Sequence, residues 1–178
     1  MKSIDEIFVP AQKIMEQIER ENLFRGQILS GFAKIDQIMS IIIIYHYSKE
    51  SPNTKLSSSK LTNSNWKINM MRKILQNEKY QSPSFNYPVL IDKTKLLKKI
   101  RNQFAHGLVF PGSSQNHAKE EDGKITMAFF ENNMWEKQIF DKITQDKLND
   151  DLYSAFRQLR DVYSHIVGRY GEYKQLVL

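Results

Sequence analysis

The sequence predicts an all-α protein: a four- to five-helix bundle that carries one short β-hairpin near residues 124–140. Two observations lead to this fold class. Apolar residues recur at helical spacing along most of the 178 residues. Two short runs, ITMAFF and MWEKQIF, are instead typical of strands, and the sequence ENN separates them as a turn would. Because we find no internal repeat and no linker, residues 1–178 are expected to form a single domain.

Two helices are predicted in the first third of the chain. The first begins near Pro10, a residue preorganised for a first helical turn, and Gly26 is expected to end or bend it. The second runs from about Gln27 to Ser48, and its wide apolar stripe predicts a central place in the core. Within it, the most apolar run covers only residues 38–47, which is too short to span a bilayer. We therefore expect no membrane association and a cytoplasmic protein.

Three further helices are predicted after a polar segment. Residues 48–65 contain little that could be buried and predict a long surface loop. An apolar stripe over residues 66–75 predicts the third helix. The fourth is expected to begin near Asp92, which is a suitable N-cap, and to end at Gly107. The last helix is predicted over about residues 144–173, where apolar residues repeat for roughly eight turns.

Composition excludes several kinds of chemistry. The chain contains no cysteine, so disulfides, a thiolate nucleophile and a Cys-ligated zinc or iron–sulfur site are ruled out. The four histidines are scattered without HxxxH spacing, and we expect neither a metal site nor a cofactor. The formal net charge of +6 permits RNA, DNA or another anionic partner.

The residues best suited to catalysis stand at the end of the fourth predicted helix, in the sequence IRNQFAHG. Arg101 offers a planar, permanent cation that matches two phosphate oxygens, and His106 can take or give a proton near neutral pH. Together they could cleave RNA without a metal. His106 would deprotonate the ribose 2′-hydroxyl or protonate the leaving 5′-oxygen, and Arg101 would stabilise the charge on phosphorus. Asn102 could orient the phosphate or the imidazole.

The spacing of Arg101 and His106 favours a site shared by two copies of the chain. Residues five apart on an α-helix lie about 140° apart around the axis and about 7.5 Å along it, so the two side chains do not share a face. Arg101 could curl along the helix. A simpler arrangement takes Arg101 from one copy and His106 from a symmetry-related copy, and a homodimer is expected on this ground.

The stretch IRNQFAHG resembles the signature of the HEPN superfamily: an Arg, a polar residue that is often Asn, and a His a few positions later on a helix of an α-helical bundle. The resemblance implies a metal-independent endoribonuclease, usually dimeric, of a toxin–antitoxin or anti-phage (abortive infection) system, with an antitoxin or defence protein as partner. It implies catalytic roles for Arg101, Asn102 and His106. Some HEPN toxins are modified on a Tyr two residues after the His; Leu108 stands there, which argues against that route. Other members are non-catalytic regulators or partner-binding scaffolds, the alternative function for this chain.

Residues outside the motif leave two interpretations each. The lysines just before it are either a solvated face or contacts for an RNA backbone, which would make binding strongly salt-dependent; these are Lys95, Lys98 and Lys99. Asp36, inside the second predicted helix, is either ordinary surface or turns inward to support the site by pairing with Arg101 or holding His106.

The bare pattern Arg-x4-His carries a real risk of coincidence. Chance produces it roughly 0.16 times in a chain of this composition, and Arg160 with His165 is a second match, read as two polar positions on a long helix. A structural interpretation of the first match is a His that favours the dipole at a helix end and an Arg that pairs with an acid. The first match is distinguished by Asn102, by the helix stop at Gly107 and by the lysines before it.

Overall fold

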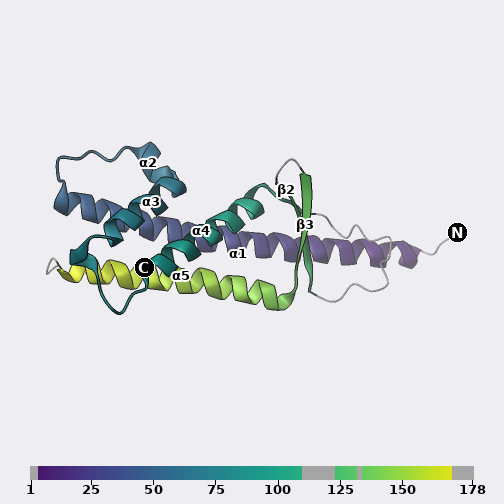
Figure 1. The fold of residues 1–178 in the computed structure, drawn as a ribbon. Helices are drawn as coiled ribbons and strands as arrows, with labels where there is room; N and C mark the ends of the chain where they lie inside the picture. Colours follow the sequence, from purple (N-terminus) through teal and green to yellow (C-terminus); the bar gives the residue numbers. More distant parts are fainter. Residues whose placement is uncertain (1–3, 110–122, 132–133, 170–178) are drawn as a thin grey trace. The chain divides into compact units, whose positions relative to one another are not determined.

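A computed structural model describes residues 4–109, 123–131 and 134–169 (Figure 1). The fold is mostly helical with one β-hairpin, as predicted. The described elements are, in order, α1 (Ile4–Glu50), α2 (Ser58–Thr62), α3 (Ser64–Leu75), the 3-10 helix η1 (Glu78–Tyr80), α4 (Tyr87–His106), β1 (Leu108–Val109), β2 (Ile125–Glu131), β3 (Met134–Phe140) and α5 (Lys142–Arg169). The chain divides into two compact units. Unit 1 is Met1–Ser30 with Ile100–Asp150, and unit 2 is Gly31–Lys99 with Asp151–Leu178.

One continuous helix, α1, replaces the two helices predicted in the first third of the chain. The boundary expected at Gly26 is wrong, because the helix runs through this residue. Gly26 is exposed, and a Cβ built there would meet nothing within 4 Å. A glycine inside a helix costs only about 1 kcal/mol, and Phe24 and Ile28 are buried on either side of it. This apolar stripe outweighs the weak local preference.

Helix α4 begins five residues earlier than predicted. Asn86, rather than Asp92, precedes the first turn, and its side chain accepts a hydrogen bond from the Val89 N–H at 3.3 Å. Pro88 fits there because a proline in the first helical turn has no backbone partner to lose. The end of α4 at His106, directly before Gly107, is as predicted.

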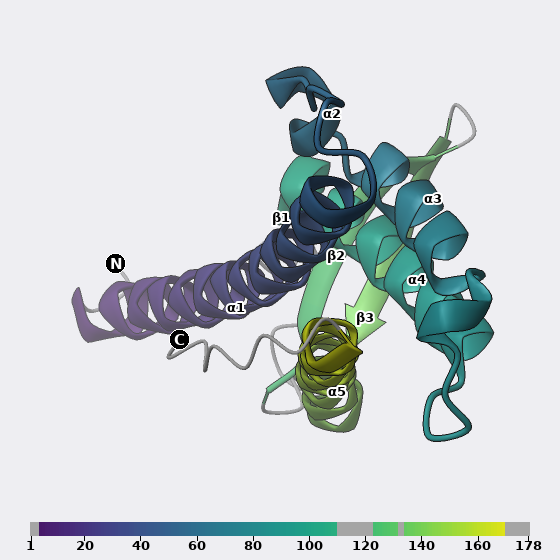
Figure 2. The same ribbon diagram turned by 90° about the vertical axis from the view of Figure 1, so that its left-hand side faces the viewer.

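Unit 2 contains helices in part of the segment predicted as a loop. The short helix α2 leads into α3 next to the end of α1 (Figure 2). Asn63 caps α3 by accepting a hydrogen bond from the Trp66 N–H at 3.1 Å. One polar side chain of the segment, Asn63, is therefore a helix cap, a role that an apolar pattern does not reveal.

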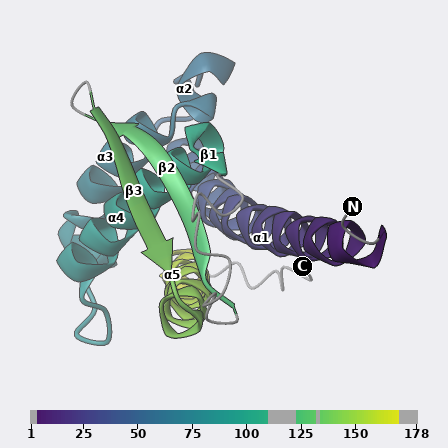
Figure 3. The same ribbon diagram turned by 90° about the vertical axis from the view of Figure 1, so that its right-hand side faces the viewer.

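The sheet of unit 1 has three antiparallel strands in the order β1-β2-β3. Strands β2 and β3 form the predicted hairpin, with Ile125 opposite Phe140 and Glu131 opposite Met134 (Figure 3). Strand β1 was not predicted, because two residues are too few for a period-two pattern. It pairs Leu108 with Ala128, so the chain enters the sheet two residues after His106.

Helix α5 begins at Lys142, close to the predicted Thr144. Asp141 precedes it and accepts a hydrogen bond from the Thr144 N–H at 2.7 Å. The hydrogen bonds from the side chain and the backbone of Thr144 lower the pKa of the Asp141 carboxyl. The predicted end near residue 173 lies outside the described residues.

Part of α1 passes a length-and-composition test for a membrane-spanning helix. The segment is Met15–Glu50, with a mean hydropathy of 1.5 over its most apolar 18 residues. Of that window, 39% is buried inside the protein. The core helix of a soluble protein passes the same test, so this finding alone assigns no location.

Candidate functional site

The motif residues lie in unit 1, on the last turns of α4. The guanidinium Nη1 of Arg101 donates a hydrogen bond to the Oδ1 atom of Asn102 at 3.2 Å. Arg101 is exposed and Asn102 is half-buried. The structure thus brings two of the three predicted catalytic side chains together and leaves the Arg101 cation accessible to an anion.

His106 is the last residue of α4 and is exposed. Within the part of the chain that the structure describes, no hydrogen bond or ion pair reaches its imidazole. At five residues from Arg101, it also lies about 140° around the helix from that side chain. A single copy therefore provides the acid–base group and the cation on different sides of one helix end.

Two contacts that sequence reasoning missed hold the turn that carries His106. The Phe104 side chain is fully buried, and its ring centroid lies 5.4 Å from that of Phe24 and 5.1 Å from that of Phe140. Arg25 donates a hydrogen bond through Nη2 to the carbonyl oxygen of Ala105 at 2.8 Å. This carbonyl lies in the last helical turn, where backbone acceptors lack a partner within the helix. No local signal links Arg25 to a residue 80 positions away.

The lysines predicted to contact an RNA backbone lie on the part of α4 that belongs to unit 2. Lys95 and Lys99 are exposed and Lys98 is half-buried. Among the described residues, Lys95 forms a long ion pair with Asp92, at 3.8 Å, and a surface pair of this kind contributes little stability. Lys95 therefore lies where an external anion can reach it.

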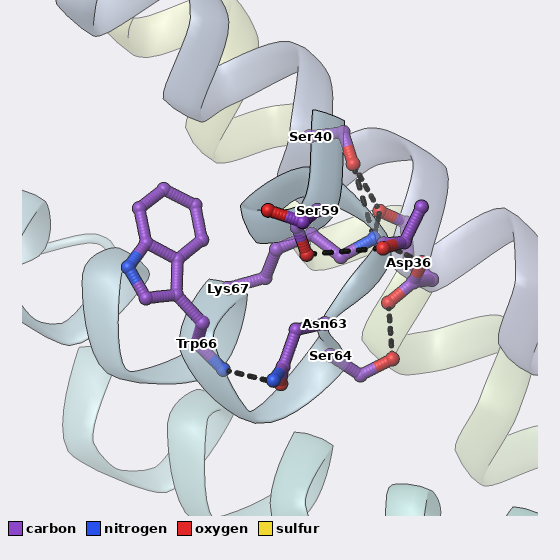
Figure 4. A network of polar contacts seen from close by, with 8 residues as sticks. Asp36, Ser40, Ser59, Asn63, Ser64, Trp66 and Lys67 are labelled. Atoms are coloured by element: carbon purple, nitrogen blue, oxygen red, sulfur yellow. Dashed lines mark hydrogen bonds and ion pairs between the residues drawn. The ribbon is translucent and has the colours of Figure 1, made fainter. Parts of the chain in front are cut away.

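Asp36 belongs to a polar network inside unit 2 (Figure 4). Its carboxylate accepts a hydrogen bond from Ser64 at 2.7 Å and forms an ion pair with Lys67. The Lys67 side chain is only 2% exposed, and its ammonium also donates to the Ser40 hydroxyl at 3.2 Å. Asp36 thus turns inward, toward α3, and neutralises a buried lysine. A role for Asp36 beside Arg101 or His106 stays a prediction.

No protein-family model, curated protein or solved structure matches this chain. The interpretation of the site therefore depends on the chemistry of its own residues. Among the described residues, no three His, Asp or Glu side chains lie close enough together to hold a metal ion.

The second Arg-x4-His match lies on α5 in unit 2, and the Nε2 atom of its histidine, His165, is buried without a hydrogen-bond partner among the described residues. Arg160 is exposed and lies 3.6 Å from the Asp161 carboxylate. His165 is half-buried, and its ring contacts Phe85 edge to face at 5.7 Å. Both are polar positions on the long helix α5, as predicted, and they provide a matched control for the first motif.

Proposed function

We propose that this chain is a metal-independent endoribonuclease of the HEPN type, acting in the cytoplasm as part of a toxin–antitoxin or anti-phage system. The supporting observation is the end of α4 in unit 1, where Arg101 and His106 are both exposed and Asn102 is bound to Arg101. A permanent cation and an imidazole that can take or give a proton supply the electrostatic and acid–base parts of RNA cleavage without a metal.

The proposed reaction is an attack of the ribose 2′-oxygen on the adjacent phosphorus. The bond from phosphorus to the 5′-oxygen breaks, leaving a 2′,3′-cyclic phosphate and a 5′-hydroxyl. An imidazole of His106 takes the 2′-hydroxyl proton or gives one to the leaving oxygen. The Arg101 guanidinium neutralises the extra charge that develops on the phosphate oxygens. Asn102 accepts from Arg101 through Oδ1, so its amide NH₂ is left to donate to a phosphate oxygen.

A homodimer would complete this site. Arg101 and His106 point away from each other around α4 by about 140°, and a two-fold axis would place the Arg101 of one copy opposite the His106 of the other. The lysines Lys95, Lys98 and Lys99 would then attract the RNA backbone, and an antitoxin or another defence protein would control the activity.

A cleavage assay with matched variants tests the proposal. The purified full chain should cut single-stranded RNA in the presence of EDTA. His106→Ala and Arg101→Ala should each slow cutting by about 100-fold or more, the usual contribution of acid–base or electrostatic catalysis. His165→Ala and Arg160→Ala remove the same residue types from the second match and should leave the rate unchanged. Cutting by His106→Ala at the wild-type rate would refute the mechanism.

A non-catalytic regulator or partner-binding scaffold is the second candidate. The observation that favours it is that Arg101, Asn102 and His106 lie on an open helix end and do not line the pocket of unit 1. Expression of wild type and of His106→Ala separates the two functions. Growth arrest by wild type alone supports catalysis, whereas equal growth with intact cellular RNA supports the scaffold.

A further inference from the structure

Unit 1 contains a pocket of about 240 Å³ that the proposed reaction does not use. Its walls come from α1, from the residues that open β2 and from the first turns of α5. These segments are far apart in the sequence, and no motif joins them, so sequence reasoning did not find the pocket. Its size suits one ring system or one phosphate group with its sugar rather than a large ligand.

Among the described residues that line this pocket, the exposed charged side chains are positive. Arg20, Lys124 and Lys142 all line it, all are exposed, and each comes from a different wall. The carboxylate of Glu21 also lines the pocket, but this residue is only 1% exposed and accepts a hydrogen bond from Gln17 at 3.1 Å. Three exposed cations thus line one small pocket, an arrangement that favours a phosphate.

Two of these cations have acidic neighbours: Lys124 interacts electrostatically with the Asp141 carboxylate, and Lys142 has a weak partner. Lys142 forms an ion pair with Asp146 at 2.8 Å, one helical turn along α5, and both side chains are exposed. Pairs of this kind contribute at most about 0.5 kcal/mol. A phosphate that contacts several cations at once can displace such a partner.

Buried hydrogen bonds build the pocket wall. Gln145 is 8% exposed, and its Nε2 atom donates to the carbonyl oxygens of Gly123 at 2.7 Å and Phe140 at 2.9 Å. These bonds join α5 to the start of β2 and the end of β3. The cations Lys124 and Lys142 stand next to these bonded positions, so their backbones are held in place without a ligand.

The same pocket offers contacts for a base or a ribose. The amide side chains of Gln27 and Asn149 line it and can hydrogen-bond to either group. The exposed side chain of Leu23 provides an apolar surface for the face of a base. Phe24 also lines the pocket and contacts Phe104, two residues before His106. The contact between Phe24 and Phe104 thus connects the wall of the pocket with the last turn of α4.

We propose that this pocket binds the phosphate and sugar of one nucleotide of a single-stranded RNA, with the phosphate held by Arg20, Lys124 and Lys142. The inference rests on the proposed function for its choice of RNA as the ligand. The pocket gives the protein a second contact with the strand, in the same unit as the motif that would cut it.

RNA binding by a double variant tests this inference. We use His106→Ala as the background, so that a labelled single-stranded RNA stays intact, and measure fluorescence anisotropy at several salt concentrations. Arg20→Ala with Lys142→Ala should weaken binding by roughly tenfold or more, because each removes a charge-assisted hydrogen bond. The slope of log affinity against log salt should fall by up to about 0.7, since the pocket holds one phosphate and each phosphate contact on a single strand contributes about 0.7.

The matched control removes the same charge from the same two helices outside the pocket. Lys34→Ala with Lys147→Ala takes one exposed cation from α1 and one from α5. This pair should change affinity by less than about twofold after salt correction. Equal losses in the two double variants overturn the inference, because the effect would then be one of net charge. No RNA binding at all overturns it as well, because the pocket would then have no RNA to hold.

Two further arms separate this inference from the proposed function and from free nucleotides. Arg20→Ala with Lys142→Ala in the otherwise wild-type chain should raise the KM for RNA more than it lowers kcat. Loss of RNA affinity in a protein that never cuts RNA refutes the nuclease and keeps the pocket. Adenosine monophosphate or inorganic phosphate could also displace the labelled RNA. If either does so at a concentration as low as that of the RNA, the pocket is a site for free nucleotides or phosphate, and the choice of RNA is overturned.

Discussion

At the scale of single residues, His46 shows how burial sets the charge state of a polar group. Its Nδ1 atom lies 3.0 Å from the hydroxyl of Tyr80, a residue with no exposed surface. Burial lowers the pKa of His46 below its ordinary value of 6.5, Glu50 opposes this shift, and Lys79 adds to it. The neutral imidazole is therefore the form that the folded unit 2 prefers.

This preference predicts a loss of stability in mild acid. A histidine whose folded pKa is lowered contributes stability above its unfolded pKa, near 6.5, and that contribution disappears as the pH falls through the lower folded value. Urea unfolding should thus show a falling free energy between pH 7.5 and pH 5.5. His46→Gln, which keeps a polar group but does not titrate, should lose less over the same interval. An equal loss in both proteins would show that other groups cause it.

Lys67 gives a second prediction at this scale. It is buried and paired with Asp36, so Lys67→Ala leaves a partly buried carboxylate without its cation and should cost about 3 kcal/mol of unfolding free energy. Asp36→Asn with Lys67→Met removes both charges together and should cost less than Lys67→Ala alone. Urea midpoints at neutral pH compare the three proteins. A double change that costs as much as Lys67→Ala or more would contradict the penalty expected for the unpaired Asp36 carboxylate.

At the scale of elements, the end of α4 depends on packing rather than on its own sequence. Phe104 is fully buried against Phe24 and Phe140. Phe104→Ala should cost about 3–5 kcal/mol because it leaves a cavity in the core of unit 1. Phe104→Leu keeps most of the volume and should cost about half as much or less. Thermal unfolding measures both, and a cost for Phe104→Ala below about 1 kcal/mol would contradict the packing described here.

The elements also show what sequence reasoning can predict. Periodicity was sufficient for α3, for the β2–β3 hairpin and for the end of α4 at Gly107, because each combines an apolar pattern with a local turn or stop signal. It failed at Gly26 and at the start of α4, where local signals compete and packing or a neighbouring cap decides. The bond from Arg25 to Ala105 and the pocket of unit 1 depend on residues brought together by the fold, and no local pattern records such contacts.

At the scale of the whole molecule, the formal charge of +6 is divided unequally: unit 1 has 10 Lys and Arg against 13 Asp and Glu, and unit 2 has 16 against 7. The motif and the basic pocket lie in unit 1, and Lys95, Lys98 and Lys99 lie in unit 2. The chain divides into two compact units. The expectation of a single domain over residues 1–178 stays a prediction. A nuclease built in this way would bind RNA through dispersed cations and cut it at one place, so its affinity and its rate should respond to different substitutions.

The proposed two-copy site can be tested by mixing inactive variants. If Arg101 from one copy acts with His106 from the other, a dimer of one Arg101→Ala and one His106→Ala chain contains one intact site out of two. Random exchange makes about half of the dimers mixed, so the equimolar mixture should recover about a quarter of the wild-type rate. Each variant alone should remain inactive, and sedimentation should show a dimer. If both residues act within one chain, mixing recovers nothing, because every copy lacks one of them.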